Sequence, residues 1–107
     1  MIILIMCTVG SEENAELIAR VLVEEKLAAC VNIVDKIKSI YSWKDEIIED
    51  TELLLLIKTP AELYEKVEAR IKALHTYEVP EIIAFDVIKG SKDYIDWVLL
   101  GAPLFKS

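Results

Sequence analysis

The stretch LLLLIKTPAE, residues 53–62, joins a strand to a helix and decides the prediction of the fold. Its first five residues are apolar at successive positions, which is typical of a strand buried on both faces. Thr59, Pro60 and Glu62 follow in the order of a helix start, with a capping threonine, a proline in the first turn and a glutamate at the capping-box position. The sequence therefore predicts a strand over residues 46–58 and a helix directly after it.

Apolar periodicity and capping residues predict the remaining elements on either side of this stretch. Continuous apolar runs indicate strands, and a serine before a stripe of apolar residues indicates a helix. In chain order, we expect a strand at 2–7, a helix from Ser11 to near Lys26, a strand over 28–43 with a bend or bulge, a tight turn at Lys44 and Asp45, the strand at 46–58, a helix that ends near His75, a strand at 81–88 and a short helix after Ser91.

The order βαββαβ plus a C-terminal helix predicts a ferredoxin-like split βαβ sandwich, an α/β (α+β) fold with an antiparallel sheet, as a single domain over residues 1–107. Right-handed crossovers place both long helices on one face of the sheet. Residues 2–6 and 53–57 are apolar at successive positions, so both faces must be covered. A second copy of the chain is the simplest cover, and a C-terminal segment lying across part of the face is the alternative.

The composition and net charge of the chain exclude some classes of binding partner. Hydrophobic residues make up 54% of the 107 positions, and 19 acidic against 12 basic residues give a net charge of −7. Such a chain repels phosphate backbones and anionic lipids, which excludes nucleic acid as a partner. The apolar opening, residues 1–7, lacks a basic flank and a small-residue cleavage site, so it is neither a signal peptide nor a membrane span. We therefore expect no membrane partner and a cytoplasmic location.

Two side chains offer metal-ligand chemistry. Cys7 supplies a soft thiolate and His75 is the one imidazole in the chain, a pair that favours copper or zinc over magnesium or calcium. Two ligands do not close a site, so Glu78, Glu81 or a second subunit must complete it. We expect both ligands at element ends, clear of the core. The alternative is that Cys7 is a small buried hydrophobe and His75 a cation at a helix C-terminus.

The chain also carries five blocks in a fixed order: Cys7-Thr8, KLAACVN at 26–32, YSWK at 41–44, LIKT at 56–59 and HTYEVPEI at 75–82. Their order and spacing, over nearly the whole chain, resemble those of the CutA family of divalent-ion tolerance proteins. The resemblance implies a ferredoxin-like fold, a cytoplasmic homotrimer assembled through long strands, and binding of copper (Cu²⁺) or another divalent cation linked to metal tolerance. It also strengthens the metal interpretation of Cys7 and His75, so that it stands level with the packing and helix-end alternative. Some members carry a second histidine where this chain has Leu74, which removes one possible ligand.

Three other functional classes were weighed against metal binding. An acylphosphatase-like enzyme needs a basic loop after the first strand, but residues 8–13 carry two carboxylates and no arginine. An RNA-recognition module needs aromatic and basic residues on its central strands, and residues 2–7 and 53–57 have neither. A trimeric signalling module similar to the PII-type transducers stays the alternative, although the chain lacks their glycine-rich and basic loops. One histidine without a recognisable nucleophile partner predicts that the protein is not an enzyme.

The sequence also predicts packing or pairing for four more residues. Cys30 follows two alanines at a strand start and is expected to pack rather than to bind metal. Tyr41 and Trp43 are expected to pack across an interface, with a ligand pocket as the alternative. Lys58 is expected to pair with a carboxylate of another subunit.

Overall fold

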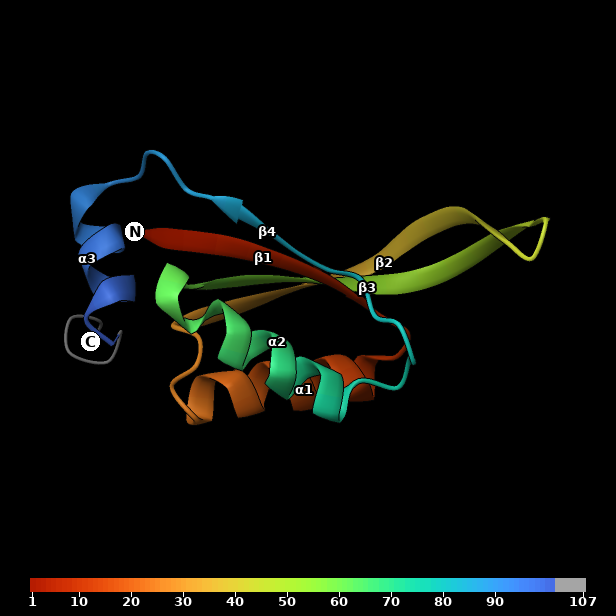
Figure 1. Ribbon diagram of the computed structural model, residues 1–107, viewed down its shortest axis with the longest axis horizontal. Coiled ribbons are helices and arrows are strands. Elements are labelled where there is room, and N and C mark those ends of the chain that lie inside the picture. The colour runs from red at the N-terminus through yellow and green to blue at the C-terminus, as the bar shows by residue number, and fades with distance from the viewer. Residues whose placement is uncertain (102–107) are drawn as a thin grey trace.

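The chain folds into a four-stranded antiparallel sheet accompanied by helices, and a computed structural model describes residues 1–101 of it. Its ferredoxin-like order βαββαβ plus a final helix is the predicted one (Figure 1). The strands lie side by side in the order β2-β3-β1-β4. The elements are β1 (Ile2–Val9), α1 (Glu12–Glu24), β2 (Cys30–Trp43), β3 (Glu46–Pro60), the 3-10 turn η1 (Ala61–Leu63), α2 (Tyr64–Leu74), β4 (Ile82–Asp86) and α3 (Lys92–Leu99).

Helices α1 and α2 lie together on one face of the sheet, as right-handed crossovers require (Figure 1). Beneath them, alternate residues of the two central strands are fully buried, among them Ile5, Leu55 and Ile57. Ile18 of α1 and Ile71 of α2 are equally buried and belong to the same cluster. The core of the subunit therefore fills the space between the two helices and the two central strands.

The opposite side of the sheet, called the open face below, is apolar but only partly covered. Residues paired across antiparallel strands share a face, so Phe85 lies beside Leu4 and Ile83 beside Met6. Phe85 is 49% exposed and Ile83 45%. Helix α3 lies at the end of the sheet where β1 begins, and the rest of the open face has no helix over it (Figure 1). The open face is formed by Leu4, Met6, Val34, Leu54, Leu56, Ile83 and Phe85.

The outer halves of β2 and β3 form a hairpin, residues 38–51, that projects beyond the helices and is called the arm below (Figure 1). The predicted bulge separates the arm from the body: the register shifts between Val34 and Ile37, and Lys36 has φ 56°. The predicted tight turn closes the tip, where Lys44 and Asp45 have φ 50° and 65°. Two residues of positive φ are the requirement of a type I′ turn, whose twist matches that of the paired strands.

Side chains on the arm are exposed although several are large and apolar. Ile47 is 76% exposed, Ile40 64% and Trp43 60%. Tyr41 donates a hydrogen bond from its hydroxyl to Asp50 Oδ2 at 2.5 Å, which joins the two strands of the arm. The arm is thus well paired along its backbone but has no layer of its own to cover its side chains.

The prediction that Thr59 caps a helix is wrong. Thr59 is fully buried, and its hydroxyl donates to the Leu27 carbonyl oxygen at 2.6 Å instead of to a helix end. It pairs with Ile3, so β3 continues to Pro60 and a 3-10 turn precedes α2. The predicted strand at 81–88 is likewise shorter: its pairing with β1 runs from Ile82 opposite Cys7 to Asp86 opposite Ile3, and beyond it the Val87 N–H donates to the Ile2 carbonyl oxygen at 3.2 Å.

Both ends of α1 are satisfied by interactions within a few residues. Ser11 Oγ accepts the Asn14 N–H at 3.1 Å, which confirms the predicted cap of α1. At the other end Lys26 takes φ 60°, its N–H reaches the Val23 carbonyl, and the next N–H reaches Leu22, which is a Schellman motif built without glycine. None of the helices within residues 1–101 has the length and apolar character needed to cross a membrane.

Candidate functional site

Cys7 lies inside the core. Because side chains alternate along β1, Cys7 shares the helix-covered face with Ile5 and Val9, and it is fully buried. Its thiol donates to the carbonyl oxygen of the next residue, Thr8, across 3.7 Å. The expectation that Cys7 stands clear of the core is wrong, because β1 runs two residues further than predicted and takes Cys7 away from the strand end.

His75 lies at the end of α2, as expected. It is the C-cap residue, and its N–H donates to the Ile71 carbonyl oxygen at 2.8 Å. Asn14 of α1 donates from Nδ2 to the Leu74 carbonyl oxygen at 3.0 Å, which holds this helix end against its neighbour. The half-buried imidazole turns toward the end of β1, where its Nε2 lies 2.8 Å from the Thr8 carbonyl oxygen.

The structure therefore brings the two predicted residues together at one atom. The Cys7 thiol and the His75 ring both contact the carbonyl oxygen of Thr8, although 67 positions separate His75 from Thr8 in sequence. This convergence follows from the sheet order, because the segment that links α2 to β4 must pass the end of β1 before β4 can pair with it.

The carboxylates of Glu52 and Glu81 place negative charge near the Cys7 thiol. Burial, followed by the charges of Glu81 and Glu52, raises the pKa of the Cys7 thiol to about 12. Glu52 is itself 7% exposed, and it accepts a hydrogen bond from the Tyr77 hydroxyl at 2.8 Å. Burial, followed by that hydrogen bond, raises the pKa of the Tyr77 phenol. At neutral pH the thiol therefore keeps its proton beside groups that would favour a cation.

The ligand set within one subunit is incomplete. Of the predicted carboxylates, Glu81 lies close enough to act on Cys7, and Glu78 is exposed. Within residues 1–101, no three His, Cys, Asp or Glu side chains converge well enough to hold a metal ion. The donors are of the right kind for copper or zinc, but one subunit supplies too few of them in one place.

Sequence reasoning missed two participants, Glu52 and Tyr77. The available signal for Glu52 was a carboxylate directly before a run of four leucines, at the position where the strand passes from the exposed arm into the body of the sheet. The signal for Tyr77 was Gly10: a Cβ at that glycine would meet the Tyr77 hydroxyl oxygen at 2.8 Å, so only glycine leaves room for the phenol.

The other residues singled out in the sequence lie elsewhere. Cys30 is half-buried and its thiol contacts Tyr94 of α3. The Lys58 amine donates to Asn32 Oδ1, so it has a polar partner inside its own chain. Trp43 is at the tip of the arm, far along the hairpin from the candidate site (Figure 1).

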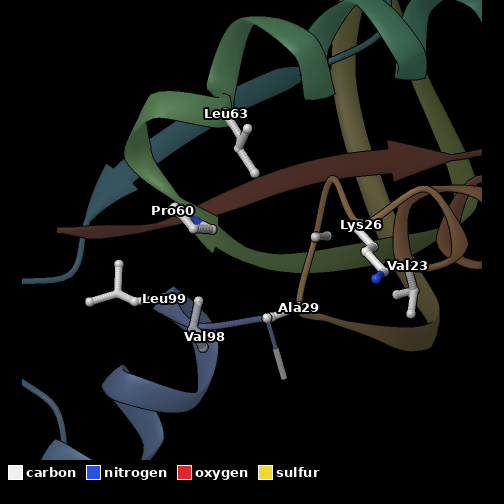
Figure 2. A pocket seen from close by; sticks show the side chains of 9 residues that line it. Val23, Lys26, Ala29, Pro60, Leu63, Val98 and Leu99 are labelled. Atoms are coloured by element: carbon white, nitrogen blue, oxygen red, sulfur yellow. The ribbon is translucent and has the colours of Figure 1, made fainter. Parts of the chain in front are cut away.

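A separate apolar pocket of about 190 Å³ lies between α3 and the end of α1. Figure 2 shows Pro60 and Leu63 on one side of it and Val98 and Leu99 of α3 on another. Lys26 is the one charged residue among those that line it. The pocket has neither a set of metal ligands nor a nucleophile with a base, so the junction of Cys7 and His75 is the better candidate. The residues that line the apolar pocket are Val23, Lys26, Ala28, Ala29, Pro60, Leu63, Val98, Leu99 and Gly101.

Comparison with known sequences gives a consistent result. The family described as "CutA1 divalent ion tolerance protein" matches residues 3–100. A "Divalent-cation tolerance protein CutA" from Thermus thermophilus is 53% identical over 94 residues, which cover 88% of this chain and 91% of that protein. The "Protein CutA" of Mus musculus is 45% identical over 91 residues, which cover 85% of this chain and 51% of the mouse protein.

Comparison with solved structures agrees with the sequence matches. The Cut A1 divalent cation tolerance protein from Thermus thermophilus superposes with a TM-score of 0.92 at 50% identity, over 94% of this chain and 98% of that one. The CutA1 from a psychrotrophic Shewanella superposes with a TM-score of 0.91 at 38% identity, over 95% of each chain.

Proposed function

Because this chain belongs to the CutA1 divalent ion tolerance protein family, we propose that it binds divalent cations, copper foremost, as a homotrimer. One observation carries the metal part of the proposal. The thiol of Cys7 and the imidazole of His75 meet at the Thr8 carbonyl, and the charges of Glu52 and Glu81 act on the same place. A soft sulfur, an imidazole and nearby carboxylates suit copper or zinc better than magnesium or calcium.

The chemistry of the donors sets conditions on binding. A cation that uses the Cys7 sulfur must displace its proton, because only the thiolate is a good ligand. It must also take a nitrogen of His75 away from an existing hydrogen bond. Before a cation binds, the sulfur of Cys7 is therefore protonated and the nitrogens of His75 are hydrogen-bonded. The remaining ligands would come from a neighbouring copy.

The homotrimer is supported by the apolar surface that the subunit leaves uncovered. Phe85 and Ile83 on the open face are nearly half exposed, and Ile47 on the arm is 76% exposed. Exposed apolar area of this extent is typical of a surface that another protein covers. A second copy offers the same strands, so self-association can continue around a closed ring.

The role that we propose is binding without catalysis, in the cytoplasm. Cys7 and Cys30 are both free thiols, which suits a reducing compartment. The family is named for tolerance of divalent ions and not for an enzyme activity. The PII-like signalling alternative is not favoured, because the family match and both structural matches are to CutA proteins.

Calorimetric titration with Cu(II) at high ionic strength tests the metal site. High salt screens the weak attraction of an acidic surface, which leaves the contribution of specific ligands. We expect Cys7→Ser and His75→Ala each to lower the affinity by about tenfold or more, the range seen when a ligand is lost or misplaced. Cys30→Ser is the matched control, since Cys30 is the other free cysteine, and its affinity should equal that of the parent.

Native mass spectrometry with and without Cu(II) tests stoichiometry and assembly together. We expect a species of three chains of 12.1 kDa that gains a fixed number of copper ions. A stable monomer contradicts the trimer. Equal copper affinity in the parent and both ligand variants contradicts the assignment of Cys7 and His75.

A further inference from the structure

The hydrogen bonds of His75 determine which of its ring nitrogens carries the proton. The backbone N–H of Tyr77 lies 3.0 Å from His75 Nδ1, and an amide nitrogen can only donate. Nδ1 must therefore be the acceptor and carry no proton. In the neutral ring the proton is then on Nε2, from which it is donated to the Thr8 carbonyl oxygen at 2.8 Å. Both nitrogens are thus occupied, one by a donor and the other by an acceptor.

Tyr77 is held in this position by its own side chain. Its hydroxyl donates to the buried Glu52 carboxylate at 2.8 Å, and its ring packs against the His75 ring with centroids 4.7 Å apart. Gly10 leaves the space that the phenol fills, because a Cβ there would come within 2.8 Å of the hydroxyl oxygen. Three elements therefore fix one loop residue: the end of β1, the inner half of β3 and the end of α2.

We propose that Tyr77 and Glu52 form a latch that closes the His75 imidazole to cations in the metal-free protein, an inference that rests on the proposed metal-binding function. Tyr77 is a positioning residue here, and it acts on a cation only through His75. A cation at Nδ1 must displace the Tyr77 N–H. A cation at Nε2 needs the ring proton to move to Nδ1, where it would face the hydrogen of that same N–H. On either route the backbone N–H of Tyr77 must move away from His75. The hydrogen bond from the Tyr77 hydroxyl to Glu52 opposes this movement.

The latch has a spectroscopic signature that needs no metal. The chain contains a single histidine, so a long-range ¹H–¹⁵N correlation spectrum of the imidazole reports His75 alone. In the neutral ring of the metal-free parent, we expect the Nε2–H tautomer to exceed the other by at least roughly ten to one, a ratio that two hydrogen bonds of about 1 kcal/mol each support. A Nδ1–H tautomer, or a near-equal mixture, overturns the latch whether or not copper binds.

Two variants separate the hydrogen bond from the charge. Tyr77→Phe removes the hydroxyl and should bring the tautomer ratio toward equality. Glu52→Gln keeps a carbonyl oxygen that can accept from the hydroxyl, so its ratio should stay close to that of the parent. An equal change in both variants overturns the assignment to the hydrogen bond.

Copper affinity provides the second readout. Tyr77→Phe should bind Cu(II) about fivefold more tightly than the parent, the factor that one ordinary hydrogen bond represents. Gly10→Ala should act in the same direction without altering either latch residue, because its Cβ displaces the phenol. If the parent shows the expected tautomer but binds no copper, the proposed function fails, and Tyr77 and Glu52 fix the His75 ring without a role in cation binding. If copper binds but neither variant binds it more tightly, the latch fails and the proposed function stands.

Discussion

The two faces of the sheet are made of similar residues but lie in different surroundings. Along the central strand β3, Leu55 on the helix-covered face is fully buried, whereas its neighbour Leu54 on the open face is only half-buried. The covered face has α1 and α2 above it, and the open face has α3 at one end alone (Figure 1). Consecutive residues of one strand lie on opposite faces of the sheet. The hydrophobicity of the sequence therefore shows that both faces must be covered, but it does not show what covers each face.

The contrast extends to the arm. The body of the sheet pairs β1 with neighbours on both sides, and its side chains pack under helices. The arm has only two strands, and a two-stranded hairpin alone is marginally stable in water. A segment of this kind stays ordered most easily when a partner packs against it. The covered face thus finds most of its cover within one chain, whereas the open face and the arm leave large apolar side chains exposed.

The largest expected effect comes from a charge on the open face. Phe85→Asp should dissociate the proposed trimer, because a buried unpaired carboxylate costs about 3 kcal/mol or more, at least roughly a hundredfold in the dissociation constant. Leu17→Asp is the matched control, since Leu17 on α1 is 46% exposed and Phe85 49%. Sedimentation at micromolar concentration should show three times 12.1 kDa for the parent and the control. Dissociation by Leu17→Asp instead would place the interface on the helix side.

Two adjacent leucines sharpen the comparison of the faces. Leu55→Ala should lower the free energy of unfolding by about 2–5 kcal/mol, because it leaves a cavity in a core that cannot fully collapse. Leu54→Ala should cost the subunit less and should act mainly on assembly. Thermal unfolding at several protein concentrations separates the two, since linkage to assembly makes the melting temperature depend on concentration. Identical behaviour of the two variants would mean that the faces do not differ.

Most of the fold could be predicted because its signals are local. Ser11 caps a helix and Lys44-Asp45 close a hairpin through interactions within a few residues. Thr59 misled the prediction because its hydroxyl bonds to Leu27, 32 positions away, and no local pattern encodes that contact. The candidate site could be predicted only in part, because it also depends on contacts between residues far apart in the sequence. Residue chemistry indicates Cys7 and His75, whereas their meeting at Thr8 depends on the sheet order and on Tyr77.

The two free cysteines lie on opposite faces and should react differently. Cys7 is fully buried, and its thiol pKa is raised to about 12, so alkylation near neutral pH should modify Cys30 first and Cys7 only on unfolding. A raised folded-state pKa means that the folded chain holds this proton more tightly than the unfolded one. The stability that results is present below the ordinary thiol pKa of 9.0 and is lost as the pH rises toward about 12.

Mass spectrometry of alkylated peptides checks the reactivity, and unfolding measured between those pH values checks the stability. Cys7→Ser should remove part of the decline, and Cys30→Ser should leave it unchanged. Rapid alkylation of Cys7 in the folded protein would contradict its place on the covered face.

The smallest expected effect concerns a helix that covers the sheet. Lys26 adopts φ 60° at the end of α1, a conformation that costs a non-glycine residue roughly 1 kcal/mol. Lys26→Gly should therefore raise the free energy of unfolding by about 0.5–1 kcal/mol, and Lys66→Gly, inside α2, should lower it by a similar amount. Denaturant titration measures both. A loss of stability in Lys26→Gly would show that the lysine side chain contributes more than its backbone strain costs.

The strand order also governs the order in which the protein can fold. The hairpin of β2 and β3 pairs residues that are close in sequence, so it can form within microseconds. Strand β1 lies at the centre of the sheet, yet it pairs with residues 53–60 and 82–86, which follow it by some fifty and eighty positions. On the ribosome, the apolar residues 2–7 must wait for both partners to be synthesised. During that interval they stay unpaired, and exposed apolar segments of this kind are prone to aggregation until their partners arrive.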